Sequence, residues 1–157
     1  NGFLFAEKEG LRQLDINAVL NQNIHKVYYN KLKQGADVTN EDGKIVKNNT
    51  VTKPPKLPKS YAFCSDTRFD EGLVKIIHGV TALYHESTFL EQHAHLAEST
   101  GHSTAKQAAE IAKLAKVGQL ILGHYSTRYD DLSQFKSEAC EVFEKVILAR
   151  DGKTITI

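Results

Sequence analysis

The sequence is poor in the residues that build covalent or cysteine-based frameworks. It has two cysteines, Cys64 and Cys140, and neither tryptophan nor methionine among its 157 residues. The two cysteines lie far apart and neither belongs to a C-x-x-C pair, which argues against a disulfide framework and against a zinc site made of cysteines. We expect both to be buried thiols.

Also missing are a long apolar run and a targeting segment. No apolar stretch approaches the roughly 20 residues that a bilayer span requires, and the N-terminus has neither the basic nor the apolar region of a signal peptide. We therefore expect a soluble cytoplasmic protein without a membrane partner. The absence of methionine and the opening Asn1-Gly2, directly before the strand-like run Phe3-Leu4-Phe5-Ala6, lead us to expect a further segment upstream.

Positive charge is concentrated in one stretch, although the net charge is only +1. Residues 24–60 carry eight lysines against three acidic residues. With tyrosines among the lysines, such a region can attract a phosphate backbone through counterion release. A solvated lysine-rich loop is the alternative, because charge patterning alone identifies no partner. The lysines are Lys26, Lys31, Lys33, Lys44, Lys47, Lys53, Lys56 and Lys59.

The pattern of apolar runs divides the chain near residue 60. Residues 1–60 contain a short strand signal, the lysine-rich stretch and the turn Glu41-Asp42-Gly43, which suits a small hairpin. Three prolines, the last of them Pro58, precede a more regular part. In residues 61–157 short apolar runs alternate with helical patterns, which indicates an α/β fold.

The clearest helix of the second part is expected to begin after Thr104. Thr104 and Gln107 fit a capping box, an apolar helical face follows, and Gly118 is expected to be the C′ residue. Near the end of the chain, Asp151-Gly152 is expected to turn an apolar strand into a second strand over residues 154–157.

Three polar residues, Asp66, Glu86 and His124, each follow a short apolar run. All three are therefore expected at the ends of adjacent strands, where α/β folds usually place their sites. Each also has a structural alternative, because strand-end polar residues are ordinary caps as well. Asp66 can cap a turn, Glu86 can pair with a lysine, and His124 can bond to the backbone.

Among the other histidines, His102 has the most informative position. It stands just before the expected helix N-terminus, where free N–H groups favour a phosphate oxygen. An imidazole there can donate a proton to a leaving oxyanion if an acidic partner keeps it protonated, and the alternative is a surface histidine near a cap. His93 and His95 form an H-x-H pattern that resembles a metal-binding pair. In a helix, however, residues two apart point in different directions, which favours a structural role for both histidines.

Four short strings stand out by their order and spacing between residues 63 and 129. They are Phe63-Cys64-Ser65-Asp66-Thr67, His85-Glu86-Ser87-Thr88-Phe89, Gly101-His102-Ser103-Thr104-Ala105 and Gly123-His124-Tyr125-Ser126-Thr127-Arg128-Tyr129. Any one of these strings is weak evidence for a family, but the four in this order resemble the motif series of the ribonuclease Z family. The opening from Gly2-Phe3 to Lys8 also resembles that family, so the resemblance covers nearly the whole chain.

The resemblance implies a fold and a set of catalytic roles. The family belongs to the metallo-β-lactamase superfamily, so the chain is expected to form the C-terminal half of an αβ/βα sandwich. Asp66 is implied to bridge two zinc ions in a complete active site, and His124 to bind one of them. His102 is implied to be the acid that protonates the leaving group, with Glu86 raising the proton affinity of its imidazole.

The resemblance also implies contacts with RNA. The expected substrate is precursor tRNA, whose 3′ trailer is removed by metal-assisted phosphodiester hydrolysis. Residues 1–60 are implied to hold a strand and the family's flexible tRNA-gripping arm, and the family is generally homodimeric. The residues implied to contact RNA are Ser103, Thr104, Ser126, Arg128, Lys31 and Lys33.

The chain departs from the family pattern in three places. Ser87 stands where alanine is usual, and His25-Lys26-Val27-Tyr28 replaces a Gly-Pro before tyrosine. The family's H-x-H-x-D-H metal motif and a further zinc-binding histidine belong upstream and are absent from these 157 residues. Asp66 and His124 alone give neither zinc its usual three or four protein ligands, so we expect the chain by itself to bind zinc weakly and not to cleave RNA.

Two other functions stay open. One is a metal-free binding or dimerisation module that keeps the half-fold, and the other is a different hydrolase of the same superfamily, since a fold alone does not fix a substrate. Half of a sandwich leaves one sheet face uncovered, so we also expect apolar strands that seek a partner.

Overall fold

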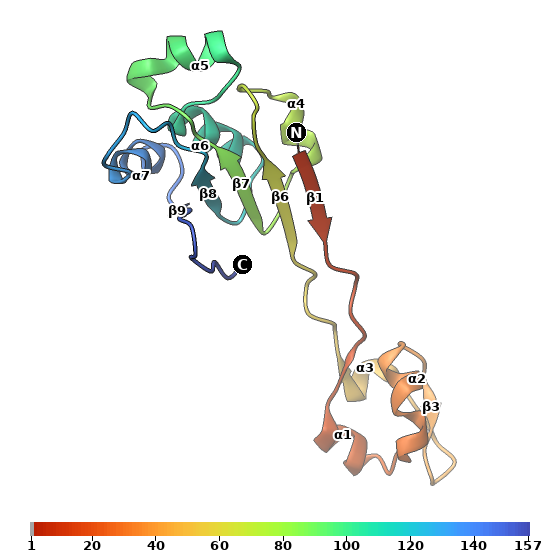
Figure 1. Ribbon diagram of the computed structural model, residues 1–157. Coiled ribbons are helices and arrows are strands. Elements are labelled where there is room, and N and C mark those ends of the chain that lie inside the picture. Colours follow the sequence, from red (N-terminus) through yellow and green to blue (C-terminus); the bar gives the residue numbers. More distant parts are fainter. Residues whose placement is uncertain (1) are drawn as a thin grey trace. The chain divides into compact units, whose positions relative to one another are not determined.

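The chain forms two compact units in a computed structural model that describes residues 2–157, and Asn1 lies outside the described residues. The first unit contains the opening strand up to Ala6 together with Lys59–Ile157. The second unit contains Glu7–Pro58. Figure 1 shows the elements of both units.

The first unit is built on a sheet whose five described strands have the order β1-β6-β7-β8-β9. β1 (Gly2–Ala6) runs antiparallel to β6 (Ser60–Cys64). β7 (Ala82–Glu86), β8 (Leu120–Gly123) and β9 (Val146–Leu148) continue the sheet in parallel. Helices alternate with the parallel strands, so the α/β arrangement expected from the sequence is confirmed.

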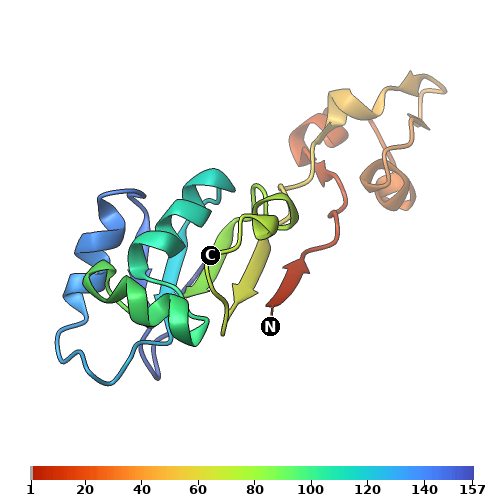
Figure 2. The same ribbon diagram turned by 90° about the horizontal axis from the view of Figure 1, so that it is seen from above.

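Helices connect the parallel strands and cover one face of the sheet. Two of them, α6 and α7, pack against each other, as Figure 2 shows. The predicted capping box is confirmed at the start of α6, where Thr104 Oγ1 accepts from the Gln107 N–H and the Gln107 side chain accepts from the Thr104 N–H. The connecting elements are α4 (Gly72–Ile76), the 3-10 turn η2 (Glu91–His93), α5 (Ala94–Thr100), α6 (Ala105–Leu114) and α7 (Ser133–Cys140).

The core lies between the sheet and α6. Alternate residues of a strand point to opposite faces, and one set of alternate strand residues is buried together with the apolar stripe of α6. The buried strand residues include Ala62, Leu83, Leu120 and Val146, and the α6 residues include Ala108, Ile111 and Ala112.

The opposite face of the sheet carries aromatic side chains. Phe63 stacks on Tyr84 with ring centroids 4.7 Å apart, and Phe5 stacks on Tyr61 with centroids 6.2 Å apart. Phe3 and Phe5 are 63% and 58% exposed. None of these five residues belongs to the core cluster beneath the helices. An exposed apolar face of this kind marks an interaction surface.

The predicted end of the Thr104 helix was wrong. α6 ends at Leu114, Ala115 is its C-cap, and Lys116 takes the left-handed position with φ of 53°. A glycine is needed at position 118 for a different reason: a Cβ there would lie only 2.5 Å from the Thr81 carbonyl oxygen. The glycine permits a close approach of two backbone segments and does not cap the helix.

The second strand expected at the C-terminus was also wrong. The Asp151-Gly152 turn forms, with the Lys153 N–H donating to the Arg150 carbonyl at 3.1 Å, but residues 154–157 form no strand. Instead, the Lys59 ammonium donates to the carbonyl of Ile157. The tail is thus held at its end by a side chain and not by a β-ladder.

The second unit has a small core of its own, in which Val19 and Leu32 are fully buried. The hairpin predicted around Asp42-Gly43 is confirmed, since β3 (Val38–Thr39) pairs antiparallel with β4 (Ile45–Val46). The unit is closed by an antiparallel pair between its first and last strands. Its other elements are β2 (Gln13–Leu14), α1 (Ile16–Asn21), η1 (Lys26–Tyr28), α2 (Tyr29–Lys33), α3 (Asn48–Val51) and β5 (Thr52–Lys53).

Both cysteines are free thiols in the structure. Cys64 is buried as expected, whereas Cys140 is only partly buried. No helix within residues 2–157 combines the length and the apolar composition that crossing a membrane requires.

Replacing Gly118 with alanine is expected to destabilise the first unit. The added Cβ would press on the backbone oxygen of Thr81, which cannot move away as the end of a flexible side chain does. We expect the free energy of unfolding to fall by about 1–3 kcal/mol, measured by urea unfolding. Gly10→Ala is the matched control, because its Cβ would meet only Pro55 Cβ at 3.8 Å. Equal stabilities of the two variants would contradict the close approach.

Candidate active site

Three strand ends meet at one edge of the sheet. β6, β7 and β8 are neighbours and run parallel, so their carboxyl ends lie at the same edge. Asp66 follows β6, Glu86 is the last residue of β7, and His124 directly follows β8. The strand-end placement expected from the sequence is therefore confirmed.

The Glu86 carboxylate is fully buried at this edge and accepts five hydrogen bonds. Oε1 accepts from the Thr67 N–H at 2.9 Å and from His102 Nδ1 at 2.7 Å. Oε2 accepts from the Thr88 hydroxyl at 2.7 Å, the Thr88 N–H at 3.2 Å and the Ser103 N–H at 3.1 Å. The segments after β6, after β7 and before α6 thus converge on one carboxylate, which pairs with a histidine and not with a lysine.

The ionisation of Glu86 follows from these contacts. Burial raises the pKa of Glu86, but the hydrogen bonds from His102, Thr88 and Ser103 outweigh burial and hold the pKa below its ordinary value. An ionised carboxylate can only accept hydrogen bonds. His102 Nδ1 must therefore carry a hydrogen, which leaves Nε2 as the second nitrogen of that ring.

A tight turn places His102 beside the sheet edge. Gly101, with φ of 76°, ends α5 in the left-handed conformation, and the His102 N–H donates to the Ala97 carbonyl at 2.8 Å. The His102 ring lies 5.3 Å from the His124 ring, centroid to centroid, and its side chain is 23% exposed. His102 thus combines a buried acidic partner with access to solvent.

Asp66, His102 and His124 form a cluster in which one ligand atom of each lies within 4.8 Å of the others. His124 Nε2 is 3.3 Å from Asp66 Oδ1. The Asp66 and His124 side chains are 64% and 40% exposed, so the cluster is open on one side. Both residues have left-handed backbone, with φ of 49° and 59°, which is uncommon outside glycine and occurs where the surroundings impose it.

The chemistry of this cluster fits a divalent metal ion. Carboxylate oxygen and imidazole nitrogen are the donors that zinc and similar ions take in proteins, and a closed zinc site uses four of them. The cluster offers three donors at most, and a ligand role for His102 would use the same Nε2 that a proton donor needs. His93 and His95 are not part of the cluster, and His93 Nδ1 lies 2.7 Å from the Tyr129 hydroxyl instead.

Two of the expected RNA contacts are buried in the structure. The Ser103 hydroxyl donates to the Thr67 carbonyl at 2.7 Å, and the Thr104 hydroxyl donates to Glu91 Oε2 at 3.0 Å. Both residues are 0% exposed. Their side chains hold the segment before α6 in place and do not reach a surface that a substrate could touch.

The other expected RNA contacts have polar or charged groups at the surface. Arg128 is exposed, its Nε donates to Ser126 Oγ at 3.3 Å, and its guanidinium lies 5.3 Å from the centre of the Phe89 ring. Lys31 and Lys33 belong to α2 of the second unit, where the Lys31 ammonium lies 5.7 Å from the centre of the Tyr28 ring.

Sequence reasoning missed Thr88, whose hydroxyl lies 2.7 Å from Glu86 Oε2 and 2.9 Å from His124 Nδ1. The residue stands in the string from His85 to Phe89, which was the only signal for it. The N–H donors of Thr67 and Ser103 were missed as well, because backbone groups carry no signature in a sequence.

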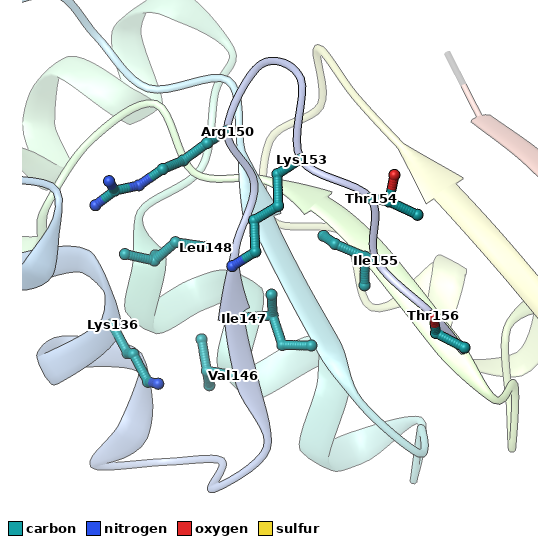
Figure 3. Close-up of a pocket in the computed structure, with 9 residues that line it drawn as sticks. All are labelled: Lys136, Val146, Ile147, Leu148, Arg150, Lys153, Thr154, Ile155 and Thr156. Atoms are coloured by element: carbon teal, nitrogen blue, oxygen red, sulfur yellow. The ribbon is translucent and has the colours of Figure 1, made fainter.

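Two hollows lie near the C-terminal end of the first unit. One, of about 540 Å³, is lined by Tyr84, His124 and Arg150 among others, and so adjoins the cluster. The other, of about 610 Å³, lies along β9 and the tail, and Figure 3 shows Lys136, Arg150 and Lys153 around its apolar lining. The second hollow contains none of the residues expected to act in catalysis.

The sequence has relatives that match it from end to end. It is 44% identical over 156 residues to a ribonuclease Z of Phocaeicola vulgatus and 41% identical over 156 residues to that of Parabacteroides distasonis. A ribonuclease Z of Porphyromonas gingivalis is 44% identical over the same length. Over nearly its whole length, the chain is thus similar to ribonuclease Z proteins. No family model matches it.

The solved structures of two other proteins show the same fold. The metallo-β-lactamase fold protein YhfI of Bacillus subtilis has a TM-score of 0.57 and 24% identity, over 60% of this chain and 39% of that one. The long-form RNase Z of yeast has a TM-score of 0.55 and 24% identity, over 61% of this chain and 13% of that one. The expected metallo-β-lactamase fold is therefore confirmed.

The match to the ribonuclease Z family is partial in length. The chain spans about half the length of the curated relatives it matches, with 99% of the chain covered and 50–51% of each relative. The H-x-H-x-D-H motif is absent in the sequence: His93-Ala94-His95 begins such a pattern, but Ala97 and Glu98 stand where the aspartate and histidine belong. The three residues of the cluster at the sheet edge are fewer than the four donors of a closed zinc site.

Glu86→Gln is expected to lower the free energy of unfolding by on the order of 3 kcal/mol, because an amide NH₂ group replaces an acceptor among buried donors. The pKa of Glu86 is depressed, so its stabilising contribution is fully present above the ordinary value of 4.5 and is lost as the pH falls through the folded-state pKa. Urea unfolding from neutral pH down to about pH 3 measures both effects.

Glu98→Gln is the matched control for this substitution, since Glu98 is exposed on α5. It is expected to leave the stability and its pH dependence unchanged. The parent chain is expected to lose stability as the pH falls. If Glu86→Gln lost as much stability over the same pH range, the assignment of that loss to Glu86 would be wrong.

Proposed function

We propose that the chain is the C-terminal half of a zinc-dependent endoribonuclease that removes the 3′ trailer from precursor tRNA by phosphodiester hydrolysis. The observation that carries the proposal is the gathering of Asp66, His102 and His124 beside the buried Glu86 carboxylate. The names of relatives 41–44% identical to the chain support the same activity.

His102 is the proton donor in this proposal. Its Nδ1 donates to Glu86 Oε1 at 2.7 Å, and the buried carboxylate stabilises positive charge on the ring. The second ring nitrogen, Nε2, can then give its proton to the departing 3′ oxygen. Glu86 orients the ring and does not itself meet the substrate, because its carboxylate is fully buried.

Asp66 and His124 are the residues that would hold zinc in this proposal. Bound zinc would activate water and stabilise negative charge on the phosphate. The exposure of both side chains leaves their donor atoms open to ligands from elsewhere. The chain by itself supplies too few ligands for a closed zinc site, and we propose that it binds zinc weakly.

The missing ligands come, in this proposal, from an N-terminal half that packs on the aromatic face of the sheet. Phe3 and Phe5 are more than half exposed on this face, and a sheet with one apolar face uncovered is stabilised by a second layer. The relatives are about twice as long as this chain, which supports the same arrangement. A cytoplasmic homodimer, which the family resemblance implies, completes the proposal.

The second unit is the RNA-binding part of the proposal. It carries nine lysine and arginine residues against six aspartate and glutamate residues. Lys47 and Lys53 form ion pairs inside the unit, whereas Lys31 and Lys33 form none with other described residues. Arg128 is proposed to meet an RNA phosphate beside His124. Ser103 and Thr104 do not contact RNA in this proposal, because both are buried.

Joining the chain to a half that carries the H-x-H-x-D-H motif is expected to restore cleavage of precursor tRNA, whereas the chain alone should not cleave. In the joined protein His102→Asn should slow trailer release at least about 100-fold. His78→Asn is the control, because His78 is exposed outside the cluster. Elemental analysis gives the bound zinc. A joined protein that neither binds zinc nor cleaves would favour the metal-free binding or dimerisation module instead.

A double substitution of Lys31 and Lys33 by alanine should weaken tRNA binding and flatten its salt dependence. Each lysine that neutralises a phosphate contributes about one unit to the slope of log affinity against log salt. Binding titrations at several salt concentrations measure this slope. The control is the double substitution of Lys47 and Lys53, which removes the same charge from paired lysines. Equal effects of the two pairs would indicate a net-charge effect and contradict specific contacts.

A further inference from the structure

The hydroxyl of Thr88 lies between two groups of the active site. Its oxygen is 2.7 Å from Glu86 Oε2 and 2.9 Å from His124 Nδ1. The Thr88 N–H also donates to Glu86 Oε2, at 3.2 Å, and the residue is only 8% exposed. Two hydrogen bonds to the same carboxylate oxygen therefore fix the place of this hydroxyl.

The single hydroxyl hydrogen decides the direction of both contacts. The ionised Glu86 carboxylate can only accept, so the Thr88 hydroxyl donates its hydrogen to Oε2. The hydroxyl oxygen then offers only lone pairs to His124 Nδ1, and this nitrogen must carry a hydrogen and donate it. In a neutral imidazole a hydrogen on Nδ1 leaves the lone pair on Nε2. Nε2 is the atom that lies 3.3 Å from Asp66 Oδ1.

The backbone on both sides of His124 is held by the same segment. The Ser87 N–H donates to the Gly123 carbonyl at 2.8 Å, and the Ser126 N–H donates to the Thr88 carbonyl at 3.0 Å. These bonds bracket His124 and keep its left-handed backbone next to Thr88. The contact between the hydroxyl and Nδ1 is therefore a fixed feature of the site.

We propose that Thr88 is a positioning residue that sets the tautomer of His124, so that Nε2 offers its lone pair to the metal site. The inference rests on the proposed function, in which the Nε2 lone pair of His124 binds a metal cation. Proteins commonly orient a metal-binding histidine through a hydrogen bond to its other nitrogen. In this chain the acceptor for His124 Nδ1 is the Thr88 hydroxyl, which is itself hydrogen-bonded to Glu86. Glu86 therefore fixes the tautomer of His102 directly and that of His124 through Thr88.

The test compares Thr88→Val with Thr88→Ser by NMR in the metal-free 157-residue chain. Valine keeps the branched shape without the hydroxyl, and serine keeps the hydroxyl. Imidazole ¹⁵N–¹H couplings at roughly pH 8.5, about two units above the ordinary histidine pKa, report which nitrogen carries the hydrogen. The signals lost in His124→Gln assign His124 among the seven histidines.

We expect the Nδ1–H tautomer of His124 to dominate in the parent chain and in Thr88→Ser, and a shift toward Nε2–H in Thr88→Val. Thr67→Val is the matched control at a neighbouring strand end. The Thr67 hydroxyl donates to the Arg68 carbonyl, and Glu86 is reached by the Thr67 backbone N–H, which the substitution retains. This control should leave the His124 tautomer unchanged.

A second measurement uses the protein joined to the half with the remaining ligands. Its zinc affinity should fall about 10- to 100-fold in Thr88→Val and recover in Thr88→Ser. If circular dichroism shows that Thr88→Val does not fold, the smaller substitution Thr88→Ala takes its place in both measurements.

The inference is overturned if His124 keeps the Nδ1–H tautomer in a folded variant without the hydroxyl, or if serine does not restore the parent tautomer. A joined parent protein that binds no zinc contradicts the proposed function instead. In that case the tautomer measurement still decides the role of Thr88, because it is made without metal.

Discussion

A buried carboxylate must be surrounded by donors, and in this chain that requirement organises the whole candidate site. Moving an ionised carboxylate out of water costs several kcal/mol unless hydrogen bonds compensate it. Glu86 meets this condition with donors from three separate segments, which hold the loop of Asp66, the ring of His102 and the hydroxyl of Thr88. The relative positions of the reactive groups are therefore set by the solvation of one charge.

The proposed function gives a common explanation for the uncovered aromatic face of the sheet and for the small number of donors in the cluster. The sheet has an aromatic face outside the core cluster, and the cluster at its edge has fewer donors than a zinc site uses. Both deficits would be met by one additional layer that packs on the face and brings ligands to the edge. The length of the relatives, about twice that of the chain, agrees with this view.

The sequence predicted those features that depend on local patterns. The capping box at Thr104, the hairpin at Asp42-Gly43 and the strand-end positions of Asp66, Glu86 and His124 follow from short-range rules, and the structure shows them. Features that depend on tertiary contacts were beyond reach. Gly118 was misread because its constraint is the distant Thr81 carbonyl, and the burial of Ser103 and Thr104 depends on partners far along the chain.

The pairing of β1 with β6 gives the second unit a particular topological status. Ala6 and Ser60 are opposite each other in the ladder, so the chain leaves the sheet and re-enters it at the same point. In terms of connectivity, the second unit occupies the place of a hairpin loop. The closure entropy of a loop grows only slowly with its length, and the β2–β5 pair draws the ends of the insertion together. A change in the length of this unit can therefore leave the register of the β1–β6 pair unaltered.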